Sequence, residues 1–224
     1  MQDVECNEEL GSGATATVYG GAMRASAVSR VAVKVFTQEY VETWQNEVRA
    51  NAAIDECALM CKIEPPIVRM IRPFGWITYE DKVPSMQPAI IYHRYGSDLS
   101  TLIRHQADTY NCGLPLVNVM QIASDVAHAL EFLHSIGIIH TDVKTGNILL
   151  EHTCGDPEPE RFRARLCDLG TAALPGRPQE RNVGTVEYCA PELIMAQPYT
   201  TACDIWAFAC MVFRITTLVH LFDV

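Results

Sequence analysis

The segment Ile139–Leu150, with the sequence IHTDVKTGNILL, constrains the fold of this chain more than any other. It places His140, Asp142, Lys144 and Asn147 at the spacing H-x-D-x-K-x-x-N. Apolar residues recur at helical spacing before it, and a short apolar strand follows it. The helical positions are Leu116, Val119, Met120, Ala123, Val126, Ala127, Leu130 and Leu133, with a stop at Gly137. The pattern predicts a loop that presents an acid, a cation and an amide between a helix and a strand.

Two closely spaced glycines near the start of the chain are typical of a phosphate-binding turn. Leu10–Val18 contains Gly11 and Gly13, and Ala16 stands where a third glycine would complete G-x-G-x-x-G. Glycine allows backbone N–H groups to come close to phosphate oxygens. Taken alone, the same residues would also suit an ordinary Gly-Ser turn.

A single lysine on an alternating strand strengthens the phosphate interpretation. Val31–Val35 has the sequence VAVKV and carries Lys34. This is the pattern of a lysine that reaches nucleotide phosphates and pairs with a glutamate on the following helix. The alternative for Lys34 is a solvated charge on an edge strand.

The partner glutamate is expected on the segment 39–50, which is rich in good helix formers and lacks Gly and Pro. Glu42 and Glu47 are both candidates. We favour Glu47, because Val48 and Ile54 give it an apolar neighbourhood that would face the sheet.

Three further motifs follow the loop. Leu166–Gly170 contains Asp168 in an Asp-Leu-Gly sequence, which on its own is common turn chemistry. Gly184–Glu192 ends in Ala-Pro-Glu, and Asp204–Phe208 opens another apolar helix. Their order after the loop matters more than any one of them.

In this order the motifs resemble those of the protein kinase superfamily. The resemblance implies an α+β bilobal fold. Residues 1–92 would form the N-lobe, a small antiparallel sheet with one helix. Residues 93–224 would form the hinge and a mostly helical, incomplete C-lobe, so that the domain is one kinase domain overall. Strand patterns are expected at Thr17–Tyr19, Arg30–Phe36, Val68–Tyr79 and Ala89–Tyr92.

The resemblance also implies roles for particular residues, with ATP and Mg²⁺ as cofactors. The predicted catalytic residues are Asp142, as the base, and Lys144. The predicted nucleotide-binding residues are Gly11, Gly13, Val18, Ala32, Lys34, Glu47 and Tyr95. The predicted Mg²⁺ ligands are Asn147 and Asp168. In the hinge segment, Tyr92 would guard the back pocket, and Asp98 would either reach the ribose or cap the next helix.

Two loop residues indicate which kind of protein kinase the chain resembles. Lys144, two residues after Asp142, is typical of serine/threonine kinases. Thr141 stands where many kinases have an Arg that pairs with a phosphorylated activation loop. We therefore expect activity that does not depend on phosphorylation of that loop.

The same H-T-D sequence, together with much of the chain from Gly113 onward, resembles the SR-protein kinase family. That resemblance implies phosphorylation of arginine/serine-rich splicing factors, regulation of mRNA splicing, and a cytoplasmic or nuclear location. The segments that carry it are Tyr40–Thr43, Gly113–Leu116, Ile138–Lys144, Asn147–Leu150, Asp204–Trp206, Ala209–Met211 and Leu221–Asp223.

The chain also departs from that family. Thr145 and Gly146 replace the usual Pro-Glu, so a more flexible catalytic loop is expected. Gly184–Glu192 has the general kinase form. The end at Val224 suggests either a fragment or a shortened kinase. Two alternatives stay open: a truncated, pseudokinase-like module that binds nucleotide or a partner without phosphotransfer, and a serine/threonine kinase of another group.

Composition supports an intracellular globular enzyme. The net charge of −10 argues against direct nucleic-acid binding and mildly favours basic substrates. No apolar run is long enough to span a membrane, and no signal peptide is recognisable. The nine cysteines include Cys57 and Cys61, which allow a zinc or redox interpretation, although reduced thiols are favoured. The polar stretch 151–160 is expected to be an exposed insertion in a hairpin.

Overall fold

The computed structural model describes residues 4–23, 30–67, 70–80, 83–152, 162–174 and 184–222. The chain divides into two compact units. The first comprises residues 1–52 and 68–95, and the second comprises residues 53–67 and 96–224. The predicted division after residue 92 stays a prediction.

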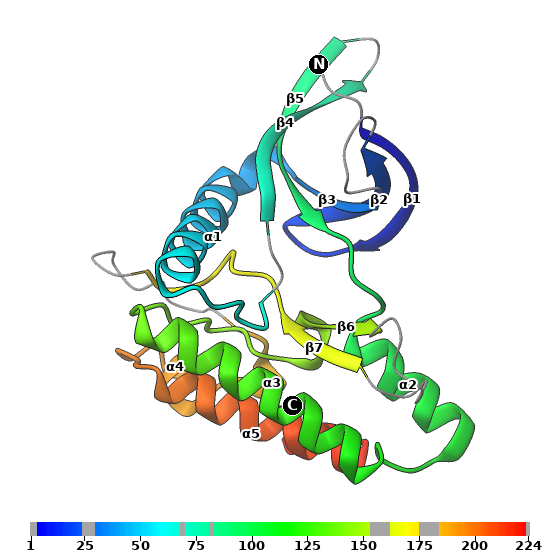
Figure 1. Cartoon of the computed structure of the whole chain (residues 1–224), viewed down its shortest axis with the longest axis vertical. Helices are drawn as coiled ribbons and strands as arrows, with labels where there is room; N and C mark the ends of the chain where they lie inside the picture. Colours follow the sequence, from blue (N-terminus) through cyan, green and yellow to red (C-terminus); the bar gives the residue numbers. More distant parts are fainter. Residues whose placement is uncertain are drawn as a thin grey trace. The chain divides into compact units, whose positions relative to one another are not determined.

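The first unit is built on a five-stranded antiparallel sheet with the order β1-β2-β3-β5-β4 (Figure 1). The strands are β1 (Val4–Ser12), β2 (Ala16–Met23), β3 (Val31–Phe36), β4 (Met70–Glu80) and β5 (Val83–His93). The predicted strands are present. β2 and β5 are longer than expected, β3 and β4 lie within one or two residues of their expected bounds, and β1 was missed. Residues 68 and 69, where the third predicted strand begins, lie outside the described residues.

Alternation along β3 divides the sheet into two faces. Val31, Val33 and Val35 are buried on one face with Ala89 and Ile91 of β5. The other face carries Lys34. This arrangement places a charged side chain beside a hydrophobic core without breaking that core.

The helix α1 (Val41–Cys61) follows a short 3-10 turn at Gln38–Tyr40 and crosses from the first unit into the second. It is much longer than the predicted helical segment. Within the first unit, the indole Nε1 of Trp44 donates a hydrogen bond to the carbonyl oxygen of Ala89 at 3.2 Å. This bond fixes one side of α1 against β5.

The second unit is mainly helical (Figure 1). Its helices are α2 (Leu99–Tyr110), α3 (Leu116–Ser135), α4 (Pro191–Ile194) and α5 (Ala202–Thr217). The carboxylate of Asp98 accepts a hydrogen bond from Thr101 N at 2.9 Å, so it caps α2, one of its two expected roles. The predicted stop after α3 is present, because Gly137 has φ 76°.

A two-stranded hairpin, β6 (Ile148–His152) and β7 (Phe162–Leu166), follows the loop 139–147. β6 runs through residue 152, so the first two residues of the predicted insertion 151–160 belong to a strand, and residues 153–160 lie outside the described residues. Asp125 of α3 accepts a hydrogen bond from Ala164 N at 2.9 Å, which ties the hairpin to the long helix.

Gly113 shows why a glycine precedes α3. A Cβ atom at this position would lie 1.9 Å from the carbonyl oxygen of Thr216, at the end of α5. The neighbouring Leu114 N donates to Ile215 O at 3.0 Å. The loop can approach α5 this closely only without a side chain at residue 113.

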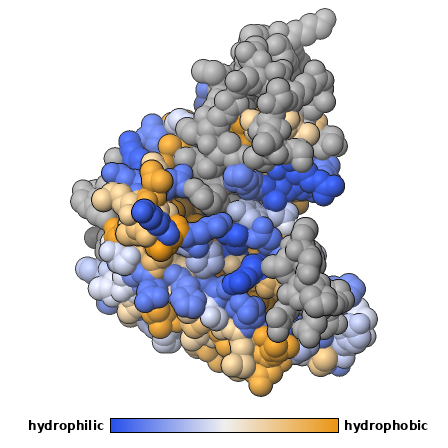
Figure 2. Space-filling view, viewed as in Figure 1, coloured by the Kyte–Doolittle hydropathy of each residue, from blue (hydrophilic) through white to orange (hydrophobic). Residues whose placement is uncertain are grey.

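Apolar side chains are exposed at several places on the second unit. Leu116, Val117 and Met120 are exposed on α3. Trp206 of α5 stacks on Phe222 with ring centroids 5.7 Å apart. Figure 2 shows hydrophobic residues gathered at the lower edge of its view, in the region of the helices. In the described part of the chain, no helix is long and apolar enough to cross a membrane.

Candidate active site

Strand register brings three predicted nucleotide-binding residues into one row. Gly11 of β1 is paired with Val18 of β2, and Val18 is paired with Lys34 of β3. Directly paired residues on antiparallel strands project from the same face of a sheet. Ala32 lies two residues before Lys34 on that face and is paired with Tyr92 of β5. The sheet therefore gathers one amine and several small groups on one surface.

The lysine of this row forms the predicted ion pair. Lys34 Nζ lies 2.8 Å from Glu47 Oε2, and Glu47 is only 1% exposed. The Tyr92 hydroxyl donates a hydrogen bond to the other carboxylate oxygen, Oε1. Each oxygen of the buried carboxylate thus has its own donor, and Lys34 is held with its amine in place. The sequence did not predict the hydroxyl contact.

Replacing Tyr92 by Phe is expected to lower the free energy of unfolding by about 1–2 kcal/mol, because a buried carboxylate oxygen loses a donor. Urea denaturation would measure the change. Tyr110→Phe, which alters an exposed tyrosine on α2, is the matched control. Equal midpoints for the two variants would show that the hydroxyl does not support Glu47.

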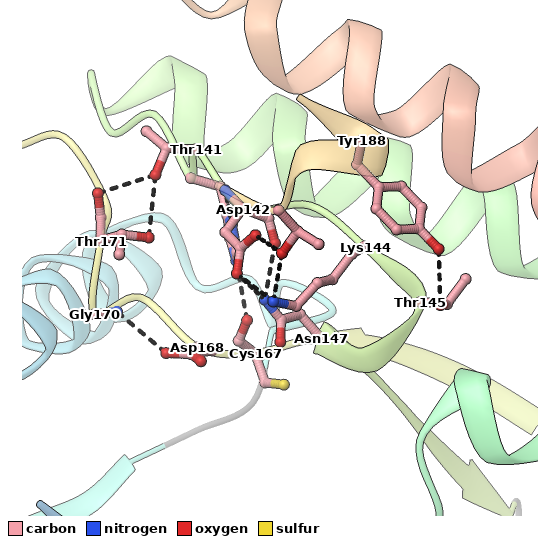
Figure 3. A network of polar contacts seen from close by, with 12 residues as sticks. Thr141, Asp142, Lys144, Thr145, Asn147, Cys167, Asp168, Gly170, Thr171 and Tyr188 are labelled. Atoms are coloured by element: carbon pink, nitrogen blue, oxygen red, sulfur yellow. Dashed lines mark hydrogen bonds and ion pairs between the residues drawn. The ribbon is translucent and has the colours of Figure 1, made fainter. Parts of the chain in front are cut away.

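The Asp142 carboxylate lies at the centre of a compact polar network (Figure 3). Its Oδ2 accepts hydrogen bonds from Lys144 Nζ at 2.7 Å and from Asn147 Nδ2 at 3.0 Å. Its Oδ1 accepts from the Thr185 hydroxyl at 2.7 Å. Lys144 also donates to that hydroxyl at 2.7 Å, so the acid, the amine and the hydroxyl form a closed ring. Such a ring fixes an acid in the orientation that a general base requires.

Asn147 and Asp168 have the chemistry of Mg²⁺ ligands. The Asn147 amide nitrogen donates to the backbone oxygen of Asp142 at 2.8 Å as well as to its carboxylate. Because the amide is planar, its oxygen is directed away from Asp142. Cys167 N donates to Asn147 O at 2.9 Å, which brings the residue before Asp168 against the loop. The donor set fits a divalent cation, and the assignment stays a prediction.

A buried acid on α5 accepts hydrogen bonds from the backbone of the loop. Asp204 is fully buried and accepts hydrogen bonds from His140 N and Thr141 N, both at 2.8 Å. It also contacts His134 Nε2 at 2.8 Å. Thr141 has φ 70°, a rare conformation for a β-branched residue. The bonds from Asp204 offset the cost of that conformation.

His140 connects two parts of the loop region through its ring nitrogens. Its Nε2 lies 3.0 Å from Cys167 O, and its Nδ1 accepts from Asp142 N at 3.3 Å. The adjacent Thr141 hydroxyl donates to Thr171 O at 3.0 Å and lies 3.1 Å from the Thr171 hydroxyl. At the position where an Arg is usual, this chain therefore has a neutral contact between the loop and the segment after Asp168.

Cys189 lies close to Asp142 and is half-buried. Burial, followed by the negative charges of Asp142 and Glu192, raises the pKa of its thiol. The thiol therefore stays protonated near neutral pH and is a poor nucleophile. No group of three His, Cys, Asp or Glu residues that could hold a metal ion occurs in the described ranges. The sulfur atoms of Cys57 and Cys61 lie 4.0 Å apart.

Comparison with known proteins agrees with this geometry. The family model described as "Protein kinase domain" matches residues 4–224. The chain belongs to the protein kinase family. The predicted α+β kinase fold is thereby confirmed, and members of the family generally use ATP and Mg²⁺.

The kinase domain is similar to several curated proteins. It is 28% identical over 215 residues to serine/threonine/tyrosine-protein kinase HT1 of Arabidopsis thaliana, covering 93% of this chain and 49% of the relative. It is 31% identical over 219 residues to the probable serine/threonine-protein kinase gdt4 of Dictyostelium discoideum, covering 96% and 12%. It is 30% identical over 230 residues to cyclin-dependent kinase E-1 of Arabidopsis thaliana, covering 100% and 46%. The chain thus spans less than half the length of these relatives.

The sequence did not predict the contacts that three residues make in this site. Thr185 and Asp204 lie within motifs that were recognised, but the motifs do not reveal which side chain contacts Asp142 or the loop backbone. The role of Tyr92 in guarding the back pocket stays a prediction, and the contact of its hydroxyl with Glu47 was not predicted. The sequence signal for Asp204 is an acid at the start of an otherwise apolar helix.

Proposed function

We propose that this domain transfers the γ-phosphoryl group of ATP to serine or threonine hydroxyls of protein substrates. The observation that carries the proposal is the Asp142 carboxylate, with Lys144 and Asn147 on one oxygen and Thr185 on the other. This acid is oriented and half-buried, and it has an amine beside it. General-base chemistry at a hydroxyl needs this combination.

Asp142 accepts the proton of the substrate hydroxyl as the oxygen attacks the γ-phosphorus, and the bond from that phosphorus to the bridging oxygen breaks to release ADP. Lys144 offers positive charge next to that acid, where charge develops on the transferring group. Its second bond, to Thr185, keeps the amine from turning away from the acid. Both carboxylate oxygens are held, so little reorganisation accompanies proton transfer.

The nucleotide phosphates are assigned to Lys34, which Glu47 orients, and to the glycine turn. At Gly11, a Cβ atom would meet nothing within 4 Å. Close approach of a phosphate to the backbone there needs no rearrangement of neighbouring atoms. Val18 and Ala32 would contact the base, Tyr95 would offer its backbone, and Asn147 and Asp168 would hold Mg²⁺. Bound Mg²⁺ supplies neutralisation of phosphate charge.

Arginine/serine-rich proteins are the proposed substrates. The support is the resemblance of the H-T-D loop to SR-protein kinases together with the net charge of −10, which favours a basic partner. The names of the relatives given above do not specify a splicing factor. A serine/threonine kinase with another substrate is therefore the main alternative outcome.

Replacing Lys34 by Met is expected to lower kcat/KM for phosphate transfer by about a hundredfold or more, because a preorganised cation is lost. The assay uses γ-labelled ATP, Mg²⁺ and two peptides, one an arginine/serine repeat and one a generic basic sequence. Lys62→Met, at an exposed lysine, is the matched control.

The two peptides separate the general proposal from the specific one. Equal transfer to both peptides would exclude preference for arginine/serine-rich substrates. Activity of Lys34→Met equal to that of the control would show that the ion pair with Glu47 does not serve phosphate binding.

A further inference from the structure

Thr145 marks the place where the catalytic loop departs from the usual sequence, and its side chain is 5% exposed. The replacement of Pro-Glu by Thr145 and Gly146 predicts a looser loop. The structure gives that prediction no support, because the Thr145 hydroxyl lies 2.7 Å from the Ser100 hydroxyl and 3.1 Å from the Tyr188 hydroxyl. Figure 3 shows Tyr188 pointing at Thr145.

The three hydroxyls form a chain across separate elements. Ser100 lies in the first turn of α2, and Tyr188 lies in the 3-10 turn Val186–Tyr188. A threonine hydroxyl can donate one hydrogen bond and accept others, so it can serve both neighbours at once. Proline offers no such group. Thr145 therefore links α2 to the turn through contacts that proline could not make.

Lys144, the residue before Thr145, contacts the first residue of the same turn. Lys144 donates to the Thr185 hydroxyl, and that hydroxyl donates to Asp142 Oδ1. Tyr188 N donates to Thr185 O at 2.9 Å, which closes the turn. The Tyr188 ring also meets His220 edge-on, with centroids 5.5 Å apart. Movement of Tyr188 would consequently displace Thr185 and alter the orientation of Asp142.

We propose that Thr145 is a positioning residue that holds the turn 185–188 through the Tyr188 hydroxyl and thereby keeps Thr185 on Asp142. The inference rests on the proposed function, because its consequence is a rate of phosphate transfer. Thr145 acts through Tyr188 and Thr185, and it does not touch the reacting atoms. Its hydroxyl supplies a local, neutral anchor for the segment that follows residue 183.

Kinetics of the 224-residue chain test this role with three substitutions. Thr145→Val keeps the shape and removes the hydroxyl, Tyr188→Phe removes the other partner, and Thr145→Ser restores a hydroxyl. Thr145→Val and Tyr188→Phe should each lower kcat about tenfold or more, while KM for ATP changes by less than about twofold. The double variant should be no slower than the slower single variant, since both changes break one contact. Thr145→Ser should recover most of the rate.

Thr109→Val, at an exposed threonine of α2, is the matched control and should behave as wild type. Three results would overturn the role of Thr145: a wild-type kcat in Thr145→Val, multiplicative losses in the double variant, or no recovery with Ser. If the wild-type chain binds ATP and transfers nothing, the proposed function itself fails, and this inference fails with it. An active wild type with an unchanged Thr145→Val variant would overturn this inference alone.

Discussion

Asp142→Asn is expected to lower kcat for phosphate transfer by about 10²–10⁴-fold, the range typical of a lost general base. Asparagine has nearly the same size, and its amide oxygen can still accept a hydrogen bond from Lys144 or Thr185. It cannot take a proton from the substrate hydroxyl. Initial rates at saturating ATP and peptide measure the effect.

The variant should remain folded and should still bind nucleotide, because asparagine fits the space of Asp142 and keeps an acceptor oxygen for its partners. Asp108→Asn, at an exposed carboxylate of α2, serves as the matched control and should keep the full rate. A rate for Asp142→Asn within a few-fold of the control would show that Asp142 is not the base.

Asp204→Asn is expected to lower the free energy of unfolding by about 2–4 kcal/mol, because buried N–H groups would lose their acceptor. The carboxylate accepts from His140 N and Thr141 N and contacts His134 Nε2, and it is fully buried. An amide would turn an NH₂ group toward at least one of these donors. Thr141 would then keep its unfavourable φ of 70° with less to offset it.

Chemical denaturation followed by tryptophan fluorescence measures this loss, since Trp206 lies on the same helix. Glu131→Gln, at an exposed acid of α3, is the matched control. If the two variants unfolded at the same denaturant concentration, Asp204 would not be the support of the loop.

The spacing of apolar residues along the sequence was enough to predict individual strands and helices. The alternation around Lys34 and the helical spacing from Leu116 to Leu133 both identified elements that the structure contains. β1 was missed because Val4–Ser12 lacks a clean alternation of apolar and polar residues and includes the glycine motif. The pairing of Lys34 with Glu47 was predictable because a strand lysine and the next helix are neighbours in sequence.

Contacts between residues far apart in sequence were not predictable in the same way. Thr145 meets Ser100 and Tyr188, which are more than forty positions away on either side. The sequence shows that position 145 is not a proline. It does not show which hydroxyl groups hold the loop in place of the rigid proline ring. The same holds for Tyr92 and Glu47, whose contact depends on how α1 packs against β5.

The central claim is that the domain transfers the γ-phosphoryl group of ATP to a protein hydroxyl with Asp142 as the base. The most direct test follows the γ-phosphoryl group. The purified chain is incubated with Mg²⁺, γ-labelled ATP and a serine-containing basic peptide, and label is counted on the peptide and in free phosphate. The account predicts label on peptide serine, depending on Asp142, with little released to water. ATP that is bound, with no label reaching the peptide, would contradict it.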